Sequence, residues 1–473
     1  MKNSIRLIFL LLLIGDNIGK AQDVPPDLDL LLRNTLDSMR TVLGAKSLSA
    51  AMQFSDGAVW AHAKGISSTT PLANVTPNDA YLIGSVTKTL TSACILQLAD
   101  EGVLSIDDSL HVWLDTMQYI NPNITIRQLL QHTSGIHDVL ATPGQQDSLL
   151  ADISKIWTPE ELIEKFIRPP LFQPGAAWSY SNTNYFLLGM IIKEATGNPY
   201  YMEIRNRFFT PLGLGSFAIP AFESLSSPVA HVWIDLNGDN IQDDAHDFYI
   251  NWLSLNSTAG AAGGYYSTPS DCTKWMRSYM RGDMISAEMM AAAKTTVSAP
   301  GSQGGQYGLG LMKNSFLGNI AYGHGGDLAY HASSWYFPEK DLSITVFTND
   351  DQKDSWKLLP VIKELLRTCM NYSPVSANLD LTVYGVQFDA YPNPFEDGFT
   401  AEYSLPDFKG DMTLTLTNSL GQRLKSVECN ANHDGQQSFK FDELKSLDTG
   451  IYFLTMNING TALKTIKLFK SPE

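Results

Sequence analysis

Hydrophobic residues recur at intervals of three and four along residues 33–43 and 87–98, which is the spacing of an amphipathic helix. Residues 47–54 and 342–347 form short runs that are typical of strands in a sheet. Helical and strand patterns mix in this way from about residue 27 to about residue 370. The pattern predicts a folded body of the α/β (α+β) class with a helical insertion.

The pattern changes after residue 370. Hydrophobic and polar residues alternate with a period of two along 399–405, 412–416 and 464–469, as they do in strands with one buried face. Glycines that suit turns fall between the runs, at Gly410, Gly421, Gly435 and Gly450. These short strands predict a small β-sandwich over residues 386–473, joined to the body by a linker at 371–385.

The first residues have the pattern of an export signal. Lys2 and Arg6 precede an apolar run at 7–14, and Gly19-Lys20-Ala21 then supplies a small-x-small cleavage site. The run is too short to span a bilayer comfortably, and no cysteine follows it that would carry a lipid anchor. We expect a signal peptide over residues 1–21 and no transmembrane segment, the alternative being a buried N-terminal helix.

Length, charge and cysteines narrow the classes of function. A chain of 473 residues exceeds one typical core, so more than one domain is expected. A net charge of −16 argues against a nucleic-acid partner, because nothing would neutralise the phosphates. The cysteines form no CxxC pair and lack zinc spacing, and the sequence leaves one disulfide open without pairing them. They are Cys94, Cys272, Cys369 and Cys429.

Ser85 and Lys88 are the first candidates for catalysis. Ser85 lies where the helix at 87–98 begins, where backbone N–H groups lack intrahelical partners and the helix dipole favours negative charge. Lys88 follows three residues later, so the two side chains share one face. A desolvated lysine there could hold a lowered pKa and accept the serine proton. Alone, this spacing also fits an N-cap serine beside a solvated lysine.

Two later segments carry groups of matching chemistry. Residues 178–185 include Tyr180, which could relay protons beside a lysine, and Asn182, which could bind a substrate amide. Residues 322–327 read Tyr-Gly-His-Gly-Gly-Asp before a strand-like segment, and glycines there would let a substrate approach the strand edge closely. Taken singly, each segment is equally a turn beside packed core residues.

Together and in this order, the three segments resemble the serine β-lactamase-like family, which includes class C β-lactamases, D-alanyl-D-alanine carboxypeptidases, D-aminopeptidases and esterases. Residues 125–136, 262–268 and 307–310 fit the same resemblance, which covers about 30–370. It implies an antiparallel sheet flanked by helices, with a helical subdomain. His132, within the first of these stretches, is expected to be structural and to have no catalytic role.

The resemblance implies a role for each matching residue. Ser85 would be the nucleophile, Lys88 its proton acceptor and Tyr180 the base and leaving-group acid. Asn182 would orient the acyl side chain, and the N–H groups of Ser85 and Asp327 would form the oxyanion hole. The substrate-binding strand would contribute His324, Gly325, Gly326 and Asp327. No cofactor would be required for catalysis.

His324 stands where resistance enzymes of this family often have lysine. A histidine with an ordinary pKa of about 6.5 is mostly neutral at pH 7, whereas lysine would be charged and could anchor a substrate carboxylate. The substitution favours the carboxypeptidase, D-peptidase and esterase branches over a dedicated β-lactamase. It also predicts that His324 holds anionic substrates better near pH 5.5 than near pH 7.5.

The tail resembles the C-terminal sorting domain of type IX secretion cargo over about 386–470. The resemblance lies in Tyr391-Pro392-Asn393-Pro394-Phe395, in the stretch 418–422 and in Gly450-Ile451-Tyr452-Phe453. It implies passage through the periplasm to the cell surface or medium, with the secretion machinery as a partner. A binding module, such as a carbohydrate-binding sandwich, is the alternative.

Residues 235–244 form an acidic loop with oxygen side chains at alternating positions, as in an EF-hand. The predicted ligands of a weak structural calcium ion are Asp235, Asn237, Asp239 and Asp243. The twelfth position is His246 instead of the usual glutamate, and the sixth is Asn240 instead of glycine. The alternative is an acidic, solvated turn.

These features predict an exported serine hydrolase that forms an acyl-enzyme on Ser85. Its substrates would be small-molecule or peptide amides or esters, such as D-amino-acid peptides, β-lactams or short esters. The alternative is a catalytically silent penicillin-recognising or adhesive surface protein that keeps the fold.

Overall fold

The computed structural model describes residues 24–239, 241–372, 387–404, 411–419, 421–430, 436–458 and 461–471. The predicted signal peptide (1–21) and nearly all of the predicted linker (371–385) lie outside these residues. No helix in the described part is long and apolar enough to cross a membrane.

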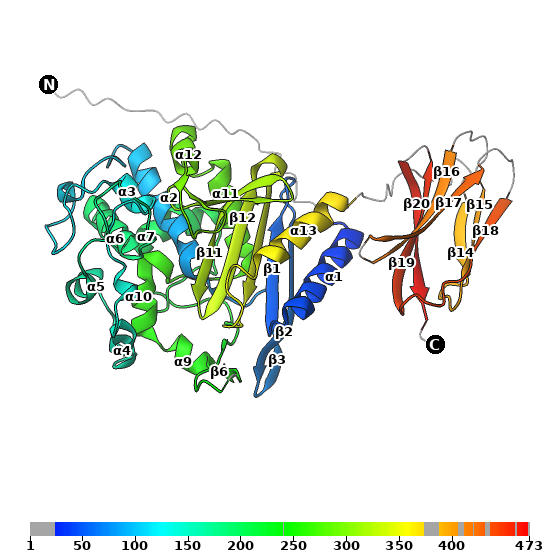
Figure 1. Ribbon diagram of the computed structural model, residues 1–473, viewed down its shortest axis with the longest axis horizontal. Helices are drawn as coiled ribbons and strands as arrows, with labels where there is room; N and C mark the ends of the chain where they lie inside the picture. Colours follow the sequence, from blue (N-terminus) through cyan, green and yellow to red (C-terminus); the bar gives the residue numbers. More distant parts are fainter. Residues whose placement is uncertain are drawn as a thin grey trace, which may run out of the picture.

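A nine-stranded antiparallel sheet forms the centre of the body, in the order β3-β2-β1-β13-β12-β11-β10-β9-β8 (Figure 1). Its middle strands β1 (Ser47–Gln53), β13 (Leu342–Thr348) and β12 (Tyr330–Phe337) are almost entirely buried. The strands expected at 47–54 and 342–347 are therefore confirmed. They pair with each other, with Ser49 opposite Phe347, so the two ends of the body meet in the middle of the sheet.

The other strands lie at the two sides of this centre or outside the main sheet. They are β2 (Val59–Thr69), β3 (Leu72–Asn74), β8 (Val297–Ser298), β9 (Gln306–Tyr307), β10 (Met312–Phe316) and β11 (Asn319–Leu328). Two short pairs complete the body: β4 (Tyr81–Leu82) with β7 (Tyr266–Ser267), and β5 (Trp233–Ile234) with β6 (Asp243–Asp244).

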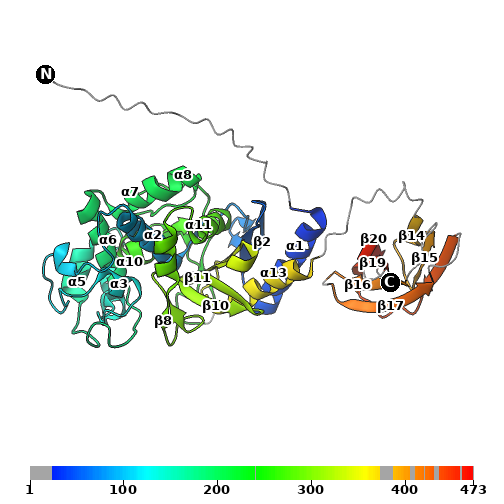
Figure 2. The same cartoon turned by 90° about the horizontal axis from the view of Figure 1, so that it is seen from above.

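Helices cover both faces of the sheet. α1 (Pro26–Leu43) and α13 (Leu359–Asn371) lie side by side on one face in both views (Figures 1 and 2). α11 (Pro269–Arg281) packs on the other face. Because successive residues of a strand point to opposite faces, Val346 lies in the core beneath α1 and α13, and Phe347 lies in the larger core on the other side.

The larger core continues into the helical region that carries much of the candidate site. Its helices are α2 (Thr87–Asp100), α3 (Ile126–Leu130), α4 (Gln145–Leu150), α5 (Pro159–Phe166), α6 (Thr183–Thr196), α7 (Tyr200–Ile204), α8 (Thr210–Leu212), α9 (His246–Ile250), α10 (Leu253–Gly263) and α12 (Ala287–Lys294). The helix predicted at 87–98 is α2, and the one predicted at 33–43 lies within α1. The predicted architecture, an antiparallel sheet flanked by helices with a helical subdomain, is confirmed.

The tail folds as two small sheets around a core of its own. One sheet has the order β14-β15-β18 and the other β17-β16-β19-β20. Their bounds are β14 (Gln387–Tyr391), β15 (Phe399–Ser404), β16 (Asp411–Asn418), β17 (Arg423–Asn430), β18 (Gln436–Phe441), β19 (Gly450–Ile458) and β20 (Thr461–Lys470). Alternate residues such as Leu414, Leu416 and Leu454 fill the space between the sheets. The predicted β-sandwich is confirmed.

All four cysteines are free thiols, so the disulfide that the sequence left open is absent. Cys94 and Cys272 are buried, and Cys369 is partly buried. Burial raises the pKa of both the Cys272 and the Cys369 thiols to about 12. Protonated, enclosed thiols of this kind are poor nucleophiles, which leaves nucleophilic chemistry to other groups.

Candidate active site

Ser85 lies in a short 3-10 turn, Gly84–Val86, that leads directly into α2. The turn begins at Gly84, whose φ of +52° is a conformation that favours glycine. A Cβ atom at Gly84 would also lie 2.8 Å from the backbone nitrogen of Asp327. Ser85 was expected at the start of the helix, and it lies just before α2. The structure adds one tight turn, which brings the serine backbone against β11.

Lys88 is fully buried in the first turn of α2, and its ammonium contacts three oxygens. Its Nζ lies 3.0 Å from Ser85 Oγ, 2.7 Å from Asn182 Oδ1 and 2.8 Å from the backbone oxygen of Ala262. Ala262 is in the last turn of α10, where carbonyl groups lack intrahelical partners. Burial lowers the pKa of Lys88 to about 7, although the Asp138 carboxylate opposes the shift.

Asn182 joins Lys88 to a carboxylate that the sequence analysis did not identify. Its Oδ1 accepts from Lys88, and its Nδ2 donates to Asp138 Oδ2 at 2.8 Å. The two contacts fix the orientation of the amide, because only the oxygen can face an amine and only the nitrogen can face a carboxylate. Asp138 stands in a loop, and nothing in the local sequence distinguishes it from a solvated turn residue.

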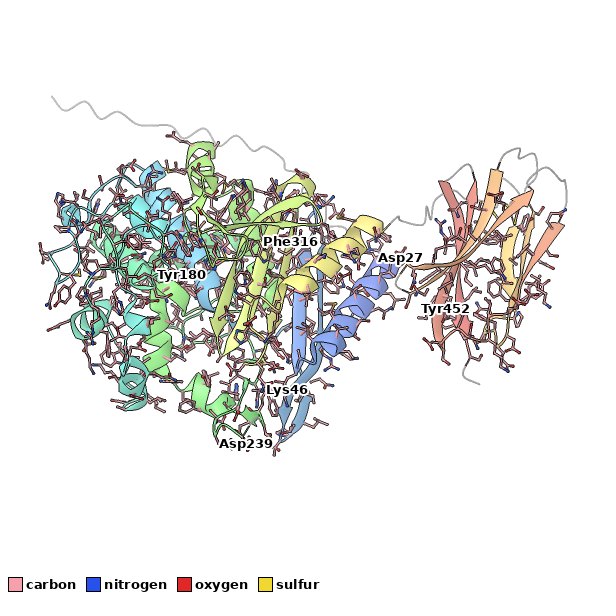
Figure 3. The ribbon with its side chains drawn as sticks, viewed as in Figure 1. Asp27, Lys46, Tyr180, Asp239, Phe316 and Tyr452 are labelled. Carbon is pink, nitrogen blue, oxygen red and sulfur yellow. The ribbon has the colours of Figure 1, made fainter. Side chains whose placement is uncertain are left out.

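Tyr180 places its ring against the lysine and its hydroxyl beside the serine. Lys88 Nζ lies 4.7 Å from the ring centroid, and Figure 3 shows Tyr180 in the helical region of the body. Burial raises the pKa of Tyr180 well above 10, while the neighbouring Ser85 hydroxyl lowers it by less. The Tyr180 hydroxyl is buried and makes no hydrogen bond of normal geometry with the residues that the structure describes. Its hydrogen-bonding capacity is therefore unused among these residues.

His132 forms the wall behind Tyr180, with its ring centroid 4.3 Å from that of the tyrosine. Its Nδ1 accepts hydrogen bonds from the backbone N–H of Ser181 (3.3 Å) and the side-chain amide of Asn184 (3.1 Å). Burial and the charge of Lys88 lower the pKa of His132 well below 6.5. A neutral ring that accepts at Nδ1 and carries its proton on Nε2 orients the 178–185 segment, in keeping with the predicted structural role.

The serine turn packs on one face of strand β11 at Gly326 and also contacts β12. Residues 322–328 pair with β12, and the opposite edge pairs with β10 only up to Gly323. A Cβ atom at Gly326 would lie 3.0 Å from the Ser85 nitrogen and 2.0 Å from the Ile83 oxygen. Only glycine allows this approach, which packs the backbone at Asp327 closely against the backbone at Ser85.

His324 is buried and uses both ring nitrogens. Nδ1 lies 2.5 Å from the Gly325 oxygen, so it carries the proton, and Nε2 accepts from the Tyr307 hydroxyl at 2.9 Å. Burial, with the charge of Lys88, lowers the pKa of His324 to about 3. The expectation that His324 gains charge near pH 5.5 is therefore wrong. Its position in the core, which the sequence pattern does not reveal, keeps it neutral.

The acidic loop lies apart from Tyr180, as the position of Asp239 shows in Figure 3. Its side-chain oxygens accept hydrogen bonds from the loop's own backbone: Asp235 from Gly238, and Asp239 from Ile241. Asp243 accepts from the Leu236 N–H. Within the described ranges, no three His, Cys, Asp or Glu side chains could together hold a metal ion. The calcium prediction has no support from this geometry.

Comparison with known proteins identifies a family for the chain. The Beta-lactamase family profile matches residues 38–365, which is most of the chain. The chain belongs to the beta-lactamase family. It is a serine hydrolase of that superfamily, as the resemblance in the sequence predicted, and hydrolases of this fold need no cofactor.

Several relatives of this beta-lactamase family member have solved structures. A D-stereospecific amidohydrolase from Streptomyces sp. is 30% identical with a TM-score of 0.61, over 70% of this chain and 96% of that one. A D-amino acid amidase from Ochrobactrum anthropi SV3 has a TM-score of 0.64 at 24% identity, over 73% and 99% of the two chains. The second likeness shows the fold alone.

Curated relatives are matched over smaller shares of their length. Penicillin-binding protein 4* of Bacillus subtilis (strain 168) is 24% identical over 63% of this chain and 66% of its own length. Protein flp of Staphylococcus aureus (strain COL) is 37% identical over 29% of this chain and 27% of its own. The tail has a separate match: residues 389–470 fit the Secretion system C-terminal sorting domain profile. That match indicates secretion through the type IX system.

The neutral histidines can be tested directly. We expect the imidazole NMR signals of His132 and His324 to stay unchanged between pH 8 and pH 5, because burial holds both pKa values below that range. His324→Gln assigns the second signal. A His324 signal that titrates between pH 5 and pH 7 would contradict the site geometry described above.

Proposed function

We propose that this protein is an exported serine hydrolase that cleaves amides or esters through an acyl-enzyme on Ser85. The observation that carries the proposal is the buried Lys88 amine, 3.0 Å from Ser85 Oγ with a pKa lowered to about 7. A lysine that is half deprotonated near neutral pH is matched to the task of a general base. The serine and the lysine therefore form a nucleophile and base pair within hydrogen-bond reach.

The three contacts of Lys88 define how its neutral form would act. A neutral amine has two N–H bonds and one lone pair. Asn182 Oδ1 and the Ala262 oxygen can only accept, so they take the two N–H bonds. The lone pair is then directed at Ser85 Oγ, from which it accepts the hydroxyl proton as the oxygen attacks the carbonyl carbon.

The remaining groups would complete the reaction. The backbone N–H groups of Ser85 and Asp327, which converge because residue 326 is glycine, would hold the carbonyl oxygen as it gains negative charge. The buried Tyr180 hydroxyl would pass a proton to the leaving group and later take one from the attacking water. Its raised pKa keeps it protonated at neutral pH and so able to donate. Lys88 would return its proton to Ser85 Oγ as the acyl bond breaks, which restores the free enzyme.

The relatives and the site together favour amides and peptides of D-amino acids over β-lactams. The Streptomyces relative at 30% identity is described as a D-stereospecific amidohydrolase. His324, neutral and enclosed by Tyr307 and Gly325, offers no charge to the carboxylate that β-lactams carry. Short esters need no such charge and would also fit. The close grouping of Ser85, Lys88 and Tyr180 argues against the alternative of a catalytically silent protein.

The acyl-enzyme can be tested by intact-mass spectrometry with a D-amino-acid amide, a short ester and a β-lactam. We expect an adduct on the Ser85 peptide that forms faster as the pH rises through about 7, where Lys88 loses its proton. Lys88→Arg should abolish it, because guanidinium stays charged below a pH of about 12. Lys294→Arg is the control, because Lys294 is a partly buried lysine whose pKa is also lowered by burial. This substitution should change the rate of adduct formation little. No adduct and no turnover with any of these substrates, in the wild-type protein and in Ser85→Ala alike, would favour the silent alternative.

The oxyanion site predicts a large effect from one methyl group. Gly326→Ala would force a Cβ atom to within 3.0 Å of the Ser85 nitrogen and 2.0 Å of Ile83 oxygen, so the strand must move away. Loss of one oxyanion donor lowers kcat roughly 100- to 1000-fold. Gly215→Ala is the matched control, since a Cβ there meets nothing within 4 Å. A Gly326→Ala enzyme that folds and keeps its full kcat would place the oxyanion site elsewhere.

Export is proposed to use an N-terminal signal peptide to reach the periplasm and the tail to cross the outer membrane. The tail's buried residues form a separate cluster from those of the body. A chain that ends at Tyr372 should therefore hydrolyse substrate with unchanged kcat but remain inside cells that secrete the full chain. Cell fractionation and assays of the purified truncated protein measure the two effects. A folded but inactive truncated protein would make the tail part of the enzyme.

A further inference from the structure

His331 lies between two hydrogen-bond acceptors beside the β11–β12 turn. Its Nδ1 is 2.6 Å from Asp327 Oδ1, and its Nε2 is 3.1 Å from the backbone oxygen of Asp351. A carboxylate and a carbonyl oxygen accept hydrogen bonds and do not donate them, so both ring nitrogens must carry protons. The contacts therefore require a charged imidazolium. It is nearly enclosed, since only 7% of the His331 side chain is exposed.

The partner carboxylate of His331 is held from a second direction. Ser355 donates its backbone N–H to Asp327 Oδ1 at 2.7 Å and its hydroxyl to Asp327 Oδ2 at 2.6 Å. Burial alone would raise the pKa of Asp327, but these hydrogen bonds and that of His331 outweigh it and lower the pKa. Asp327 is thus an anion that ties the end of β11 to β12 and to the segment that follows β13.

The groups that face His331 all favour its charged form. Asp327 faces it from β11, and Asp351 faces it from the segment after β13, with Asp350 beside it. Burial alone would lower the pKa of His331, but the hydrogen bond to Asp327 and the charges of Asp327 and Asp351 outweigh it and raise the pKa above 6.5. This direction agrees with the geometry, in which both ring nitrogens of His331 face acceptors.

We propose that the His331 imidazolium is a positioning residue that holds the Asp327 N–H against the serine turn, and that its deprotonation switches off acyl transfer on the alkaline side. The inference rests on the function proposed above. The carboxylate that His331 binds belongs to the same residue as the oxyanion N–H, so the contact acts on that N–H through one residue's backbone. Near Gly84 this backbone has no room to shift without changing the site.

The other titrating groups of the site do not produce such an alkaline loss. Deprotonation of Lys88 near pH 7 increases the rate. Burial raises the pKa values of Tyr180 and Tyr307 well above 10, and His132 and His324 are already neutral. The profile of kcat against pH should therefore rise through about 7 and fall again as the pH passes the raised pKa of His331. The falling limb reports His331.

Substitution of His331 tests the assignment. A displaced reacting group typically costs up to about 100-fold in rate, so His331→Gln should lower kcat roughly 10- to 100-fold at the wild-type optimum. KM should change little, because substrate contacts are kept. The falling limb should disappear, since glutamine does not titrate. His62→Gln is the matched control: His62 lies 3.0 Å from Asp37 in a similar pair between β2 and α1, and this change should leave the profile intact.

Asp327→Asn supplies a second variant in case His331→Gln does not fold. It keeps an oxygen for Ser355 but removes the charge that raises the pKa of His331, so the falling limb should move to lower pH. NMR of the wild-type protein should also show both His331 ring nitrogens protonated at pH 7. A falling limb that is unchanged in both variants, or a neutral His331 ring, would overturn the proposal. Turnover that survives in Ser85→Ala would instead overturn the proposed function itself.

Discussion

The site depends on one enclosed cation. Lys88 is fully buried, and among the residues that the structure describes no carboxylate makes a hydrogen bond with its nitrogen. Burying an ammonium without a counter-ion is costly, and the protein relieves the cost by letting the group lose its proton near neutrality. The oxygens around it are neutral, and the Asp138 carboxylate, whose charge opposes the shift, is joined to Lys88 through the Asn182 amide. A direct ion pair would have kept the amine charged and useless as a base.

The site also requires two backbone segments to approach each other closely. The serine turn and the glycine-containing part of β11 are packed so tightly that a methyl group does not fit at Gly84 or Gly326. The edge of β11 away from β12 pairs with β10 only up to Gly323, so beyond that residue it stays free beside the serine turn. The nine-stranded sheet thus supplies a rigid edge, and the helical region supplies the nucleophile and the base.

Much of this could be predicted from sequence. The central strands of the body are almost wholly buried and are mostly hydrophobic. The tail strands have one buried face, so hydrophobic and polar residues alternate along them. In both cases the sequence pattern follows directly from the burial of the strand. Ser85, Lys88, Tyr180 and Asn182 stand in recognisable motifs, which the structure brings together. Asp138 acts through a long-range contact with Asn182, and nothing in its local sequence marks it. Ala262 lies in a stretch that fits the family, but its contact with Lys88 comes from the fold, as does the contact of His331 with Asp351. The state of His324 was mispredicted for the same reason: its pKa is set by Tyr307 and by burial, both of which come from the fold.

The pairing of β1 with β13 has a consequence for how the chain matures. The sheet acquires its central strand only after residue 348 has been made, so the first strands must wait for nearly the whole body before they are covered. Contacts of such long sequence separation slow folding and leave strand edges open to wrong partners in the meantime. The export proposed above would be compatible with this order of events, because a chain that follows a signal peptide through the inner membrane unfolded would reach the slow step only afterwards. The topology therefore suits delivery first and folding second.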